Sequence, residues 1–97
     1  MAILEYDKNK LIGLLTVFFP NAKIYLFGSQ ARDTAFSYSD IDIAIDNGKL
    51  VDPILIGEAR AVINETNIVN KIDLVDFYDV PAGFQKQILE QGVLWKQ

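Results

Sequence analysis

The spacing of apolar positions separates predicted helices from predicted strands along this chain. Residues 11–19 carry a broad apolar stripe with helical spacing that ends at Pro20, which predicts a first helix with Asp7 as its cap. Similar patterns predict two further helices over residues 53–64 and 81–90. Each of these begins at a proline, a residue that suits the first turn of a helix.

Shorter runs of bulky and β-branched residues predict the strands. These runs cover residues 22–27, 40–45 and 72–77, and residues 93–95 form either a short last strand or a packing tail. The turn over residues 29–32 can open a further short helix between the first two strands, so helices and strands alternate along the chain. This order predicts a small α/β fold, with one sheet and helices over one or both of its faces.

Composition then limits the class of protein. The chain has 97 residues, of which 51% are hydrophobic, and this is the size of one domain, residues 1–97, with its own core. A net charge of −4 and a pI near 4.6 argue against direct binding of nucleic acid, which needs clustered cations. We find no apolar run long enough for a membrane span and no signal peptide, so we expect a cytoplasmic protein.

Cysteine and histidine are both absent from the sequence. Their absence removes disulfides, the usual zinc ligands, cysteine nucleophiles and histidine bases. An enzyme with this composition must rely on carboxylates and on metals that prefer oxygen ligands.

Asp40 and Asp42 would lie on one face of the strand 40–45, with Cα atoms about 6.5–7 Å apart, and the isoleucines of this strand would point to the other face. Two carboxylates at this spacing can converge on a pair of divalent ions. They could instead form the solvent face of an amphipathic strand. Aspartate is disfavoured in strands, however, and neighbouring like charges repel unless a cation relieves them, so these residues alone favour neither interpretation. Together with Gly28-Ser29, they lead us to favour metal binding.

The turn after the strand 22–27 is a candidate phosphate site. Gly28 permits a tight turn and close approach of the backbone, and Ser29 with nearby N–H groups can receive phosphate oxygens. Taken alone, this pair is more often an ordinary strand-to-helix turn. Arg32 has two interpretations, because it can contact phosphate or pair with a carboxylate, either Asp33 or one near the metals.

Asp73 is the candidate for a third metal ligand or for a base, provided that its strand lies beside the strand 40–45. Asp76 is its rival on the same strand. In a regular strand these two side chains point to opposite faces, and we favour Asp73.

In order and spacing, Gly28-Ser29, Asp40-x-Asp42 and Asp73 resemble the motifs of the nucleotidyltransferase superfamily of DNA polymerase β and kanamycin nucleotidyltransferase. The local sequence is most similar to the minimal nucleotidyltransferases, or MNT proteins. The resemblance covers nearly the whole chain and implies a mixed β-sheet flanked by helices. One departure is Asp33, which stands where this subgroup usually has glycine and could repel a triphosphate.

The resemblance also implies a reaction. Asp40, Asp42 and Asp73 would bind two Mg²⁺ ions, and Asp73 would help to deprotonate the acceptor. Gly28 and Ser29, with Arg32 nearby, would hold the phosphates of ATP or another nucleoside triphosphate. A nucleoside monophosphate would then pass to a hydroxyl group, and pyrophosphate would leave.

Larger members of the superfamily carry a second domain that completes the acceptor pocket, and these 97 residues leave no room for one. The resemblance therefore implies a partner, a helical HEPN-family toxin that the MNT protein modifies as its antitoxin. One alternative is a catalytically weak or inactive module that binds nucleotide and the HEPN partner. Another is an enzyme that acts on a small-molecule hydroxyl across a homodimer interface. Three aromatic residues could face a partner or belong to the core: Tyr78, Phe84 and Trp95.

Overall fold

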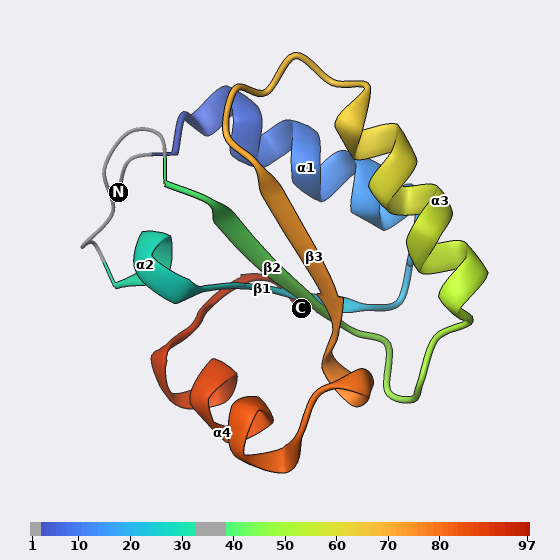
Figure 1. Ribbon diagram of the computed structural model, residues 1–97, viewed down its shortest axis with the longest axis vertical. Helices are drawn as coiled ribbons and strands as arrows, with labels where there is room; N and C mark the ends of the chain where they lie inside the picture. Colours follow the sequence, from blue (N-terminus) through green and yellow to red (C-terminus); the bar gives the residue numbers. More distant parts are fainter. Residues whose placement is uncertain (1–2, 33–38) are drawn as a thin grey trace.

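A four-stranded sheet lies between helices in the computed structural model, which describes residues 3–32 and 39–97 (Figure 1). The elements in chain order are α1 (Glu5–Phe18), β1 (Lys23–Phe27), α2 (Gly28–Ala31), β2 (Ile41–Asp46), α3 (Pro53–Asn64), β3 (Ile72–Asp76), the 3₁₀ turn η1 (Phe77–Asp79), α4 (Ala82–Gln91) and β4 (Val93–Lys96). The predicted α/β fold with a mixed sheet flanked by helices is confirmed.

The strands follow the order β3-β2-β1-β4. β1 runs antiparallel to both of its neighbours, β2 and β4, whereas β2 and β3 are parallel. Parallel neighbours need a crossover connection, and α3 supplies it between β2 and β3. Residues Val93–Lys96 pair with β1, so the end of the chain is a strand and not a packing tail.

The two faces of the sheet are covered unequally. Of the described helices labelled in Figure 1, α1 and α3 lie over one face and α4 lies over the other. The first face holds the main core, in which Ile41, Ile43 and Ile45 are fully buried as their alternation predicts. A smaller cluster around Tyr25, Ala44, Phe77 and Ile88 fills the second face, beneath α4. Part of that second face is therefore left open for polar side chains.

Helix boundaries show where sequence signals succeed. α3 begins at the predicted Pro53, and Asp52 caps it by accepting a hydrogen bond of 2.9 Å from the Ile54 N–H. The predicted cap at Asp7 is wrong, because α1 begins at Glu5. Asp7 lies instead in the first turn, where its negative charge faces the positive end of the helix dipole.

Among the described residues, no helix is both long enough and apolar enough to cross a membrane.

The predicted loop over residues 34–39 lies mostly outside the described part of the chain. Asp33 also lies outside it, and the effect of Asp33 on nucleotide binding stays a prediction.

Candidate functional site

Three side chains from three neighbouring strands form one row across the open part of the α4 face. Phe27 at the end of β1 pairs with Asp42 of β2, and Asp42 pairs with Asp73 of β3. Paired residues share a face, and neighbouring strands lie about 4.8 Å apart. The structure therefore brings Asp42 and Asp73 side by side, as the sequence predicts. Asp40 is exposed and lies one residue before β2 begins.

The charge balance around Asp42 is unfavourable for an ionised carboxylate. Burial raises the pKa of Asp42 above its ordinary value of 3.8, and the negative charges of Asp73 and Asp40 raise it further. Two cations, Arg32 and Lys71, act in the opposite direction and lower this pKa. Repulsion and burial outweigh them. A proton or a metal cation placed beside Asp42 would therefore relieve a real electrostatic cost.

Gly28 is required by the close approach of its backbone to Asp42. Its φ angle of 74° lies in the left-handed region that glycine adopts without strain. A Cβ atom at this position would collide with Oδ2 of Asp42 and would lie 3.1 Å from its Cγ. The predicted tight turn is therefore present, and it holds the chain directly against the carboxylate.

Ser29 and Arg32 lie directly after this turn, in and at the end of helix α2. Ser29 is half-buried in the first turn of the four-residue helix α2. Arg32 is exposed, and its Nη1 donates a long hydrogen bond of 3.5 Å to Oε1 of Gln91 in α4. Since the charge of Arg32 also acts on Asp42, this guanidinium lies in the electrostatic field of the carboxylates.

Two amide side chains that sequence reasoning missed hold the backbone just before Asp40. Nε2 of the buried Gln30 donates to the carbonyl oxygen of Ser39 at 3.1 Å, and Nδ2 of Asn70 donates to the same oxygen at 2.9 Å. These donors come from α2 and from the segment before β3, so they fix the entry into β2 from both sides. No pattern of apolar or charged positions signals such contacts in advance.

Asp76 has a different role from its neighbour Asp73. It is 6% exposed, and its Oδ2 accepts a hydrogen bond of 2.7 Å from the Val51 N–H. Its Oδ1 accepts a bond of 3.0 Å from the Tyr78 N–H. Asp76 therefore fastens the loop before α3 to the end of β3. Asp76 therefore has a structural role, and the functional role of Asp73 stays a prediction.

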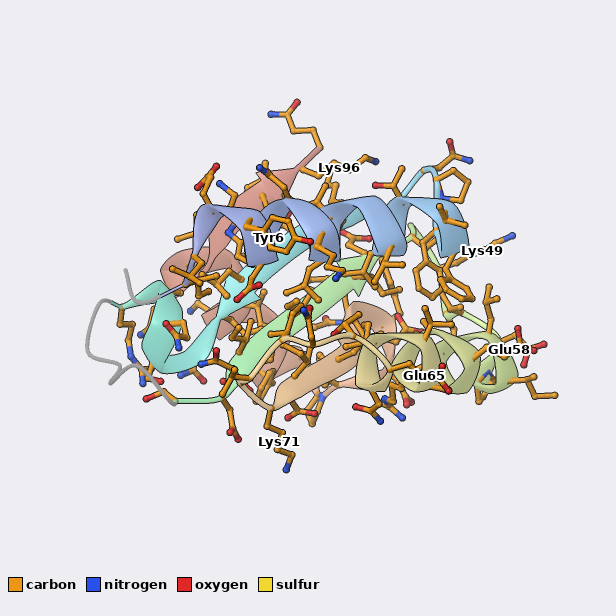
Figure 2. All side chains as sticks on the ribbon, turned by 90° about the horizontal axis from the view of Figure 1, so that it is seen from above. Tyr6, Lys49, Glu58, Glu65, Lys71 and Lys96 are labelled. Atoms are coloured by element: carbon orange, nitrogen blue, oxygen red, sulfur yellow. The ribbon has the colours of Figure 1, made fainter. Side chains whose placement is uncertain are left out.

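Within residues 3–32 and 39–97, no three acidic side chains already converge as a metal cage. The donor set still suits a hard cation such as Mg²⁺, which is commonly held by one or two carboxylates together with phosphate oxygens of a substrate. Lys71, which sequence reasoning also missed, extends outward from the start of β3 (Figure 2). Asp40, Asp42 and Asp73 therefore lie near two exposed basic side chains, Arg32 and Lys71.

Comparisons with known proteins point in one direction. A family model described as Polymerase beta, Nucleotidyltransferase matches residues 9–96. The chain is 33% identical over 93 residues to protein adenylyltransferase MntA of Shewanella oneidensis, a match that covers 94% of this chain and 66% of the relative. It is 26% identical over 69 residues to a probable protein adenylyltransferase MntA of Haemophilus influenzae, covering 71% of this chain and 60% of that protein. The chain thus spans slightly less than two thirds of these curated relatives.

Solved structures give the same result. A toxin–antitoxin complex with AMP-PNP superimposes with a TM-score of 0.77 at 32% identity, over 91% of this chain and 71% of that chain. A complex of an MNT antitoxin with a tri-AMPylated HEPN toxin of Shewanella oneidensis has a TM-score of 0.74 at 29% identity, over 98% of this chain and 71% of that chain. The similarity therefore extends over the sheet that carries Asp42 and Asp73.

Proposed function

This chain belongs to the nucleotidyltransferase family of polymerase beta, and on that premise we propose that it transfers AMP from ATP to a hydroxyl group of a partner protein. The observation that carries the proposal is the row of Asp42 and Asp73 on an open part of the sheet, with Gly28 pressed against it. Such a row offers negative oxygens to a cation that arrives with a triphosphate.

Mg²⁺ is the cation that this donor set fits. Asp40, Asp42 and Asp73 would hold it as oxygen donors, and burial together with the negative charges of Asp73 and Asp40 raises the pKa of Asp42. When bound, two such ions would neutralise the charge that develops on the phosphate oxygens during transfer.

Each of these residues and its neighbours Gly28, Ser29 and Arg32 then has a defined role. Gly28 and Ser29 would lie against the β- and γ-phosphates, and Arg32 would offset their charge. Asp73 would accept the proton of the attacking hydroxyl group. A bond forms between that oxygen and the α-phosphorus, the bond from the α-phosphorus to the leaving oxygen breaks, and pyrophosphate departs.

The partner we propose is a HEPN-family toxin, with this chain as its antitoxin. Support comes from relatives named protein adenylyltransferase and from the complex in which an MNT antitoxin accompanies a tri-AMPylated HEPN toxin. Modification of the toxin would be the route of neutralisation. The cytoplasmic location expected from the sequence stays a prediction.

Transfer of label from α-labelled ATP with Mg²⁺ to the HEPN-family protein encoded beside this one tests the proposal. Replacing a metal carboxylate removes several kcal/mol of transition-state stabilisation, so Asp42→Asn should lower the rate about a thousandfold. Asp46→Asn is the matched control. Asp46 ends the same strand and accepts a turn hydrogen bond from the Gly48 N–H, which asparagine can also accept.

The control variant should label the partner as the wild type does. Absence of label with every nucleoside triphosphate, in a complex that still forms, would contradict transfer and favour the binding module. Equal labelling by wild type and Asp42→Asn would show that the carboxylate row is not the site of transfer.

A further inference from the structure

The carbonyl oxygen of Ser39, the residue before Asp40, is held by two amide side chains from distant parts of the chain. Gln30 of α2 donates to it at 3.1 Å, and Asn70 of the segment before β3 donates to it at 2.9 Å. A carbonyl oxygen has two lone pairs, so it can accept both bonds at once. The backbone that leads into Asp40 is therefore fixed ahead of the first residue of β2.

A backbone hydrogen bond holds the other side of Asp40. The Ile41 N–H donates to the carbonyl oxygen of Lys71 at 2.9 Å, at the start of the parallel pairing of β2 with β3. The Ser39 carbonyl belongs to the peptide unit before Asp40, and the Ile41 N–H belongs to the peptide unit after it. Peptide units are planar and rigid, so a hydrogen bond to each of these units restrains both backbone dihedrals of Asp40. The direction in which its side chain leaves the backbone is thereby restrained as well.

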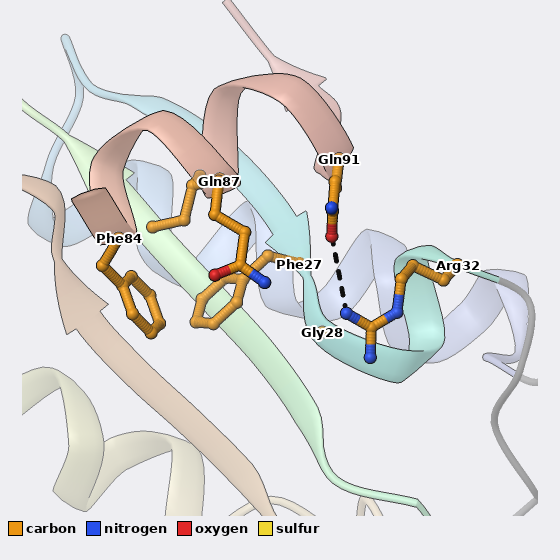
Figure 3. Close-up of a pocket in the computed structure, with 7 residues that line it drawn as sticks. Phe27, Gly28, Arg32, Phe84, Gln87 and Gln91 are labelled. Carbon is orange, nitrogen blue, oxygen red and sulfur yellow. Dashed lines mark hydrogen bonds between the residues drawn. The ribbon is translucent and has the colours of Figure 1, made fainter.

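The helix that carries Gln30 is itself anchored at both ends. At its start, the backbone of Gly28 lies so close to Asp42 that a Cβ atom would collide with the carboxylate. Directly after its last residue, Arg32 donates a hydrogen bond to Gln91 of α4 (Figure 3). The amide of Gln30 therefore extends from a held backbone, and it can set the position of the chain segment to which it donates.

Burial makes the Gln30 amide a poor source of stability. The side chain is 1% exposed, and its Oε1 has no hydrogen-bond partner in the part of the chain that the structure describes. A buried acceptor without a partner costs free energy at least comparable to what one hydrogen bond contributes. The unpartnered oxygen therefore offsets the bond from Nε2 to Ser39, and the amide has little net effect on folding. Its clear effect is on the position of the Ser39 carbonyl.

We propose that Gln30 and Asn70 are positioning residues, which hold the exposed Asp40 carboxylate in the direction needed to bind Mg²⁺. This inference rests on the proposed function, in which Asp40 is a metal ligand. Replacing a group that orients a ligand without touching the metal commonly lowers metal affinity about 10- to 100-fold. The two amides also join the separate parts of the site. One belongs to the helix that begins at Gly28, and the other leads into the strand that carries Asp73.

The test measures Mn²⁺ binding in the presence of AMP-PNP by electron paramagnetic resonance, which counts the free ion, and the urea midpoint of unfolding. Mn²⁺ prefers the same oxygen ligands as Mg²⁺. Gln30→Met keeps an unbranched side chain but lacks the donor, so it should weaken Mn²⁺ binding about tenfold while the urea midpoint stays close to that of the wild type. Asn70→Ala should also weaken Mn²⁺ binding. The double variant should lose more than the product of the two single losses, because each single variant keeps one amide donor on the same oxygen.

Gln85→Met is the matched control. Gln85 of α4 also donates through Nε2 to a backbone carbonyl oxygen, that of Phe77, at 2.7 Å. Phe77 follows the end of β3, whereas Asp73 lies near its start, so loss of this bond should leave Mn²⁺ binding unchanged. Equal weakening of Mn²⁺ binding in Gln85→Met and Gln30→Met would overturn the positioning role, because the effect would then follow from loss of any such amide.

The outcomes separate this proposal from the proposed function. If the wild type binds Mn²⁺ and transfers label, and both Gln30→Met and Asn70→Ala bind Mn²⁺ as tightly, the positioning role is wrong and transfer stands. A lower urea midpoint with unchanged Mn²⁺ affinity would make the amides purely structural, which also overturns the proposal. If Gln30→Met does not fold, Mn²⁺ binding by Asn70→Ala decides. If the wild type neither binds Mn²⁺ with AMP-PNP nor transfers label, the proposed function fails and this inference fails with it.

Discussion

The two ends of strand β3 carry the same residue type in opposite situations. Asp73, near the start of the strand, is exposed beside Asp42. The pair lies on the same face of the sheet as α4, in the part that this helix does not cover. Asp76, three residues later, is buried on the other face and accepts hydrogen bonds from two backbone N–H groups. At one end of the strand negative charge is only partly offset by the cations Arg32 and Lys71, and at the other end each oxygen of the Asp76 carboxylate accepts a hydrogen bond.

This difference is the physical basis for our proposal that Asp73 is a functional carboxylate, whereas Asp76 has a structural role. A buried carboxylate that accepts backbone hydrogen bonds stabilises the fold, because its removal would leave buried donors without partners. A carboxylate pair in mutual repulsion costs stability, and a bound cation offsets that cost by supplying positive charge. Equal changes in stability on substitution of the carboxylates at the two ends would contradict this difference.

The largest stability effect is expected at Asp76. Asp76→Ala leaves the N–H groups of Val51 and Tyr78 without their acceptor, which should lower the free energy of unfolding by about 3 kcal/mol. Urea denaturation measures the loss. The exposed Asp79, in the adjoining 3₁₀ turn, provides the control, and Asp79→Ala should change stability by less than about 0.5 kcal/mol. Equal stability of Asp76→Ala and wild type would show that these hydrogen bonds are dispensable.

Gly28 should couple to Asp42 with the next largest effect. Gly28→Ala places a residue with a side chain in the left-handed region and brings its Cβ into collision with the Asp42 carboxylate. It should therefore lower the free energy of unfolding by about 2 kcal/mol or more. In an Asp42→Ala background the collision disappears and only the backbone strain remains. A double-mutant cycle in denaturant should therefore give a coupling of about 1 kcal/mol.

A helical glycine provides the control for this cycle. Gly13 lies inside α1 with no atom within 4 Å of a Cβ, so Gly13→Ala should stabilise the protein by about 0.5–1 kcal/mol. Additive costs of Gly28→Ala and Asp42→Ala would contradict the close approach that joins the turn to the carboxylate row.

Asp42→Asn should have a smaller effect of the opposite sign from Asp76→Ala. Because the folded-state pKa of Asp42 is raised, the folded protein binds more protons than the unfolded chain, and its stability falls as the pH rises from the ordinary value of 3.8 through the raised pKa. Asparagine lacks this penalty. The variant should therefore melt at a higher temperature than the wild type at pH 7, and the gap should close below the ordinary pKa.

Thermal unfolding from pH 3 to pH 7 measures this gap. Glu58→Gln serves as a control for loss of a negative charge, since Glu58 is exposed on α3. A wild type that is more stable than Asp42→Asn at pH 7 would show that Asp42 is already satisfied, as Asp76 is.

The sequence predicts the carboxylate row because a strand alternates strictly. Burial of Ile41, Ile43 and Ile45 forces Asp42 to the opposite face, and parity alone places Asp73 and Asp76 on different faces. The motif resemblance to nucleotidyltransferases is confirmed by the family model. These features depend only on local periodicity and on spacing along the chain, which a sequence displays directly.

Other features could not be predicted because they depend on tertiary contacts. Gln30 and Asn70 meet at one carbonyl oxygen although they come from elements forty residues apart, and neither residue type indicates a partner. The same holds for the pocket of about 160 Å³ between β1, α2 and α4, where Phe84 of α4 packs against Phe27 of β1. The sequence left Phe84 undecided between core and partner surface, and in the structure its side chain lines this pocket.

The most direct test is the melting temperature with and without Mg²⁺ and AMP-PNP. It shows whether the Asp42–Asp73 end of the sheet carries excess negative charge that Mg²⁺ offsets when it binds together with the nucleotide. We expect a higher melting temperature for the wild type when both are added, because a ligand that binds only the folded state stabilises it, and no change for Asp42→Asn. The same increase in both proteins, or no increase in either, would contradict the claim.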